Sequence, residues 1–254
     1  MDPLQLFLLF LAAVVAGAIN AVAGGGSFIS FPTLILAGVP PITANATNST
    51  ALWPGSLASV GAYRRELAVQ RQGLVLFSAI SLTGGLLGAL LLLRTGESTF
   101  EALIPYLLLL ATLVFALSPR ITRAARRLGK GQEGAMRRVG VLALYFAIAV
   151  YGGFFGAGLG ILTLAVLGLL GLDNIHEMNA LKTLQASLVN GIAVLAFVVA
   201  GVVQWPIALL MTVGAIVGGY GGAAIARQVS PAVVRWVVIA ISVSLTTYFF
   251  ITAG

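Results

Sequence analysis

Residues 23–27 read Ala-Gly-Gly-Gly-Ser, and residues 157–161 read Ala-Gly-Leu-Gly-Ile, 134 positions later. The same gapless offset pairs Asn45-Ala46 with Asn179-Ala180, and it pairs Gly84, Gly85 and Gly88 with Gly218, Gly219 and Gly222. An apolar chain that contains such a repeat is typical of a secondary transporter. The repeat therefore bears on function as well as on fold.

The composition is that of a membrane protein. Of the 254 residues, 59% are hydrophobic and 8% are charged, whereas soluble domains carry roughly 25% charged residues. Apolar runs of about 20 residues recur along the chain, and each is long enough to cross roughly 30 Å of hydrocarbon. The sequence therefore predicts an all-α polytopic membrane protein.

Each half of the chain is predicted to contain long helices and one short segment. The long apolar segments lie near 4–23, 44–63, 73–93, 101–118, 139–157, 178–201, 206–226 and 232–252, and the short ones near 26–38 and 160–172. Each short segment follows a glycine run, and at about 20 Å it is too short for a full crossing. We therefore expect two transmembrane repeats, 1–118 and 139–254, each with full-length helices plus a short glycine-broken segment.

The linker at 119–138 is predicted to be a basic cytoplasmic loop. It carries seven of the fourteen basic residues, which is the pattern of the positive-inside rule rather than of nucleic-acid binding. A short surface helix on anionic lipid is the alternative. If the short segments cross the membrane, each half has five passes and the repeats are inverted, which the positive-inside rule favours. If they re-enter and return, the repeats run parallel.

The glycine runs are candidate substrate contacts. Glycine weakens a helix, and broken backbone at membrane depth is tolerated where it is buried or lines a cavity. A helix that restarts after the break points amide donors at an anion. The alternative is close helix packing through small residues, which we favour for Gly84–Gly88 and Gly218–Gly222. The candidates are Gly24, Gly25, Gly26, Ser27, Gly158 and Gly160.

Polar side chains follow each short segment. In the first half these are Asn45, Thr47, Asn48 and Ser49, and in the second half Asn179, Lys182 and Thr183, continued by Gln185, Ser187 and Asn190. Asn179, Lys182 and Thr183 share one helix face. Helix capping is the alternative for Asn45 and Thr47. Lys182 is the strongest single candidate for a substrate contact, because a cation inside the membrane is costly and therefore implies a function. The alternative is that its side chain extends to the membrane interface.

Several functions have no signature in the sequence. We find no paired-histidine metalloprotease motif, no Walker loop and no nucleophile elbow, and no cysteine is present. We therefore predict no enzymatic activity, no cofactor, no metal site and no nucleic-acid partner.

The motifs resemble those of the TauE/SafE family of sulfite exporters. The resemblance rests on the glycine run with the following Pro32, on Asn-Ala-Thr-Asn-Ser at 45–49, and on the second-half copy with Asn179 and Lys182. It implies a polytopic protein of the cell inner (plasma) membrane that moves sulfite, sulfonates or related anions. The second half has Val166 where the first has Pro32, and Leu159 where the first has Gly25, so the two half-sites are not equivalent.

Together, these features predict a secondary transporter, an exporter of a small sulfur-containing anion such as sulfite or an organosulfonate, that works by alternating access. Lys182 would supply neutralising charge, and the polar side chains would replace part of the anion's water. Coupling to a proton or ion gradient and assembly as a homo-oligomer are compatible with this prediction. A passive anion or small-solute channel and a membrane subunit of a larger complex remain the alternatives.

Overall fold

The computed structural model describes residues 1–22, 25–62, 67, 71–129, 135–172, 174–225 and 231–252. These residues form helices joined by turns, with no strand among them, which confirms the all-α prediction. In chain order the helices are α1 (Pro3–Val22), α2 (Ser27–Leu36), α3 (Pro41–Ala62), α5 (Arg71–Arg94), α6 (Glu97–Gly129), α7 (Ala135–Phe154), α8 (Leu159–Leu169), α9 (Ile175–Val199), α10 (Trp205–Ile225) and α11 (Pro231–Thr252).

The predicted short segments are the short helices α2 and α8, of 10 and 11 residues. Within the described residues, five helical stretches are long and apolar enough to cross a membrane, in α1, α5, α6, α9 and α11. The apolar stretches of α7 and α10 are shorter, and α3 is not among the five although eight long segments were expected. Its polar residues Asn45, Thr47, Asn48, Ser49 and Thr50 lower its hydropathy.

In the linker expected at 119–138, α6 continues as a helix to Gly129, so the first part of this linker is helical. This stretch is rich in Ala, Arg and Leu, which favour helix, and it has a buried face: Ala125 is 6% exposed. The guanidinium of Arg126 donates to the sulfur of Met178 at 3.3 Å, whereas Arg123 and Arg127 are exposed. Packing of that face extends the helix beyond the apolar segment.

The chain divides into two compact units that do not follow the halves of the sequence. Unit 1 comprises residues 1–55, 92–113 and 197–254, and unit 2 comprises residues 56–91 and 114–196. Unit 1 therefore contains α1, α2 and most of α3 together with α10 and α11. Unit 2 contains α7, α8 and most of α9 together with most of α5. Each unit thus combines helices from both halves of the sequence.

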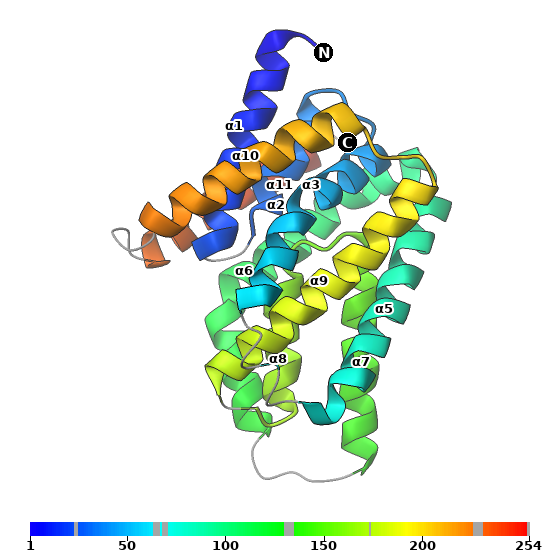
Figure 1. Ribbon diagram of the computed structural model, residues 1–254, viewed down its shortest axis with the longest axis vertical. Coiled ribbons are helices and arrows are strands. Elements are labelled where there is room, and N and C mark those ends of the chain that lie inside the picture. The colour runs from blue at the N-terminus through cyan, green and yellow to red at the C-terminus, as the bar shows by residue number, and fades with distance from the viewer. Residues whose placement is uncertain are drawn as a thin grey trace. The chain divides into compact units, whose positions relative to one another are not determined.

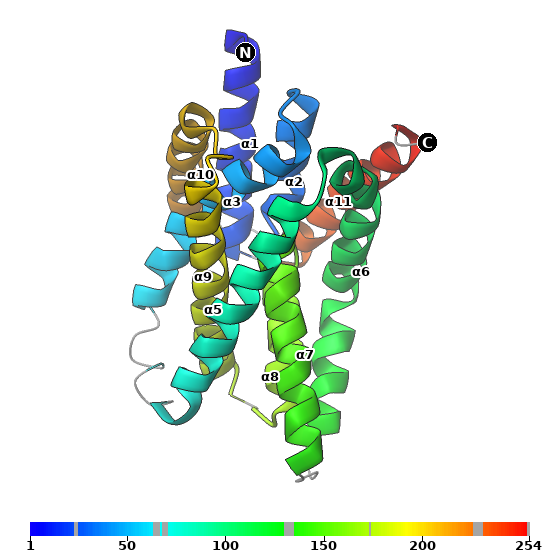
Figure 2. The ribbon, with the colours of Figure 1, turned by 90° about the vertical axis from the view of Figure 1, so that its right-hand side faces the viewer.

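In unit 1, α1 lies against α10, as Figures 1 and 2 both show. Glycines make this approach close. A Cβ added at Gly218 would overlap the carbonyl oxygen of Val14, and one added at Gly17 would overlap that of Ala215. The two backbones meet with no side chain between them, which is the use of small residues expected between membrane helices.

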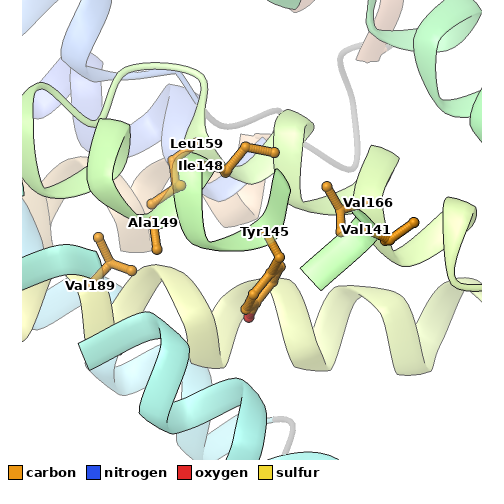
Figure 3. Packing of buried hydrophobic residues seen from close by; sticks show 7 residues of the cluster. All are labelled: Val141, Tyr145, Ile148, Ala149, Leu159, Val166 and Val189. Carbon is orange, nitrogen blue, oxygen red and sulfur yellow. The ribbon is translucent and has the colours of Figure 1, made fainter. Parts of the chain in front are cut away.

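In unit 2, α7 packs against α8, as Figure 2 also shows. A buried cluster joins Val141, Tyr145, Ile148 and Ala149 of α7 to Leu159 and Val166 of α8 and to Val189 of α9 (Figure 3). Glycines again bring α5 and α7 together: a Cβ at Gly88 would overlap the carbonyl oxygen of Val150, and one at Gly84 would lie 2.6 Å from the Cβ of Ala149. The packing role expected for these glycines agrees with these contacts.

The helices follow the sequence repeat. The starts of α3, α5 and α6, at Pro41, Arg71 and Glu97, are each 134 positions before the starts of α9, α10 and α11. Helix α1 of the first half packs against α10 of the second half. The corresponding helices of the opposite halves, α7 for α1 and α5 for α10, also pack against each other. Within unit 1, Thr112 and its own counterpart Thr246 have hydroxyl oxygens 3.4 Å apart.

Candidate anion-binding site

The first glycine break is a packed turn. Gly25 has φ 100°, a conformation that favours glycine, and Gly24 lies outside the described residues. A Cβ at Gly26 would overlap the carbonyl oxygen of Ala16 on α1, and the Gly26 amide donates to Asn20 Oδ1 at 2.8 Å. Ser27 begins α2. The amide of Gly26 is therefore already engaged by the protein itself.

The polar face of α3 is buried and bonded within unit 1. Asn45, Thr47 and Asn48 are 2%, 0% and 3% exposed, and Ser49 is partly buried. Ser30 of α2 donates to Asn48 Oδ1 at 2.6 Å, and the amide of Gln204 donates to Thr47 Oγ1 at 3.1 Å. They do not cap their own helix, because α3 begins at Pro41 and the Ile42 amide of its first turn donates to Glu97 at 3.0 Å.

We expect Ser30→Ala to lower the stability of the protein without weakening anion binding. The change leaves the buried Asn48 carbonyl without its hydroxyl donor, which costs about 1–3 kcal/mol. Thermal unfolding in detergent measures the first effect and a sulfite titration the second. The double variant Ser30→Ala/Asn48→Leu removes both partners and should recover part of the loss. A weakened sulfite affinity in Ser30→Ala would contradict a purely structural role for this pair.

The second glycine break is built differently. Gly156 and Gly158 have φ 83° and 76°, and Gly158 precedes α8 without any side-chain cap. Gly160 makes room for Lys182: a Cβ there would lie 3.3 Å from Cδ of the lysine. The absent side chain lets the lysine stem lie across the first turn of α8. The structure thus brings Gly160 and Lys182 together from α8 and α9.

Lys182 is partly buried, and its ammonium donates to Asn179 Oδ1 at 3.2 Å. Among the described residues it forms no ion pair. An ammonium has three protons and no acceptor, so one bond to a neutral amide leaves two donors and the charge without a partner among the described residues. Thr183 follows on the same helix and is partly buried. This arrangement can hold an anion.

The first-half candidates belong to unit 1 and the second-half candidates to unit 2. Their local chemistry differs: Thr47 and Asn48 have protein partners, whereas Lys182 has one neutral partner. Sequence analysis did not identify Ser30 and Asn20, which bond Asn48 and Gly26. The signal for Asn20 was present, since it is an amide in an apolar segment beside a glycine run. Ser30 has no such signal.

The apolar helices are those of a multi-pass membrane protein, and comparison with known proteins identifies the class as membrane transporters. The family model for the sulfite exporter TauE/SafE matches residues 9–249. The chain belongs to this family.

Curated relatives from three bacteria match nearly the whole chain. It is 29% identical to a probable membrane transporter protein of Haemophilus influenzae, over 95% of this chain and 92% of that protein. It is 29% identical to the probable membrane transporter protein YfcA of Escherichia coli K12, over 95% and 88%. It is 30% identical to the probable membrane transporter protein ORF9 of a Sinorhizobium species, over 94% and 90%. No solved structure matches.

Proposed function

We propose that this transporter exports a small sulfur-containing oxyanion, such as sulfite or an organosulfonate, across the cell inner membrane by alternating access. The observation that carries the proposal is Lys182, a partly buried ammonium that lies across Gly160 with the neutral Asn179 as its described partner. A cation in this position costs free energy unless an anion binds next to it. The description of the family as sulfite exporters supports the choice of anion.

The anion would bind on the α9 face formed by Asn179, Lys182 and Thr183. The ammonium compensates the charge, and the amide and hydroxyl groups replace part of the lost hydration, because charge-assisted hydrogen bonds are stronger than neutral ones. The polar face of α3, with Asn45, Thr47, Asn48 and Ser49, would support the fold of unit 1, in which Thr47 and Asn48 have protein partners. Alternating access requires the bound site to open to one side of the membrane at a time.

Flux of radiolabelled sulfite into and out of proteoliposomes tests the proposal. We expect flux that saturates with sulfite concentration, responds to an imposed proton or ion gradient, and exceeds that of protein-free liposomes. Saturation is the signature of a binding site that must change conformation in each cycle. Fast flux without saturation would indicate a channel instead. No flux above protein-free liposomes, for sulfite or for sulfonates, would refute the proposal.

A further inference from the structure

Gln185 of α9 has a buried side-chain amide. The side chain is 1% exposed, and neither Oε1 nor Nε2 has a hydrogen-bond partner among the described residues. Nearly all buried polar groups in proteins are paired, because an unpaired buried amide is costly. Such a group is satisfied by a water molecule, an ion or a ligand. For Gln185, its place on the helix favours the transported anion.

The position of Gln185 connects it with Lys182. It follows the lysine by three residues, so the two side chains are neighbours on the helix surface. The counterpart of Gln185 in the first half is Ala51, which is 1% exposed. The Thr212 hydroxyl donates to the carbonyl oxygen of Ala51 at 3.3 Å. The second half therefore has a cation in place of Asn48 and an amide in place of Ala51. These two differences lie side by side on one helix.

A glutamine amide presents one donor and one acceptor side by side, as it does when it pairs with an adenine edge. The complementary ligand has an acceptor oxygen next to an O–H donor. A singly protonated oxyanion has this pair of groups, whereas a fully deprotonated anion has acceptors alone and would leave Oε1 unpaired. A single negative charge also matches the single ammonium of Lys182.

We propose that Gln185 contacts the transported anion and selects singly protonated oxyanions, which for sulfite means hydrogen sulfite, over anions without an O–H group such as organosulfonates. The proposal rests on the proposed function and makes it narrower. In this proposal Lys182 recognises the negative charge of the substrate, and Gln185 recognises its O–H group.

A matched pair of ligands tests this selection at one pH. Methylphosphonate with one negative charge and methanesulfonate have nearly the same shape and the same charge, but only the phosphonate has an O–H group. We expect the purified wild-type protein to bind hydrogen sulfite, and to bind methylphosphonate about 10-fold or more tightly than methanesulfonate, because the sulfonate leaves a buried acceptor unpaired. Isothermal titration in detergent measures all three affinities.

Gln185→Leu should abolish the preference for methylphosphonate and weaken hydrogen sulfite binding by a similar factor. Because the variant removes an unpaired buried amide, its melting temperature without ligand should equal or exceed that of the wild type. The control is Thr163→Val, in which a fully buried hydroxyl that donates to the Leu159 carbonyl at 2.8 Å is replaced by a methyl group. We expect this control to bind all three ligands as the wild type does.

The outcomes separate the two proposals. If the wild type binds none of the three anions, the proposed function fails and this inference fails with it. If the wild type binds sulfite and Gln185→Leu keeps both its affinity and its preference, the proposed function stands and the role of Gln185 is wrong. In that second case the amide holds a water molecule or packs for stability, and a lowered melting temperature identifies packing.

Discussion

Lys182→Met is expected to weaken anion binding and transport strongly while the ligand-free protein remains at least as stable as the wild type. Methionine keeps the length of the lysine stem, which lies across Gly160, but it removes the charge. Losing the charged partner of a desolvated ion costs about 2–5 kcal/mol, which is roughly 30-fold or more in Kd. The same change removes an ammonium whose described partner is one neutral amide, so folding without ligand should not suffer.

Two further variants identify the role of the charge. Lys182→Arg keeps the charge with a different donor geometry and should retain part of the binding. Arg123→Met removes an exposed cation of α6 and should leave sulfite affinity unchanged, which excludes a general effect of net charge. Sulfite titration and proteoliposome flux measure the result. A Lys182→Met protein that binds and transports like the wild type would show that the lysine merely reaches the interface.

Gly218→Ala is expected to be strongly destabilising. The added methyl group would overlap the carbonyl oxygen of Val14 and would lie 2.8 Å from the Val14 Cα, and these backbone atoms cannot rotate away. Helices α1 and α10 must therefore separate, and overpacking of this kind costs typically 1–3 kcal/mol and occasionally more. We expect a lower melting temperature in detergent and a lower yield of monodisperse protein.

The matched control lies one turn away on the same helix. A Cβ at Gly221 meets no atom within 4 Å, so Gly221→Ala adds the same methyl group in open space. It should gain stability, because alanine is favoured over glycine in a helix by about 1 kcal/mol. Gly88→Ala, which would overlap the Val150 carbonyl in unit 2, should behave like Gly218→Ala. Equal melting temperatures for Gly218→Ala and Gly221→Ala would contradict the close approach of α1 and α10.

The helices could be predicted from sequence because their causes are local. The apolar segments at 73–93 and 232–252 became α5 (Arg71–Arg94) and α11 (Pro231–Thr252), and the short segments became α2 and α8. In lipid each helix satisfies the hydrogen bonds of its own backbone. The length, the hydropathy and the glycine breaks of a segment are therefore sufficient to predict that it is a helix. The sequence left a loop and a short helix as alternatives for 119–138, and the structure continues α6 to Gly129 with Ala125 buried.

The site could be predicted only in outline. The sequence by itself determined the class of protein, the repeat, and the two polar faces after the glycine breaks, since these are patterns along one chain. It paired Gly26 with Gly160 and Asn48 with Lys182 by position, but it could not show which of these residues the fold engages. Only the tertiary structure decided that Gly26 is packed against Ala16 and that Asn48 is bonded to Ser30. It also showed that Gly160 makes room for Lys182 and that Gln185 has no hydrogen-bond partner among the described residues. The physical reason is that hydrogen-bond satisfaction depends on groups far apart in sequence, which only packing brings together.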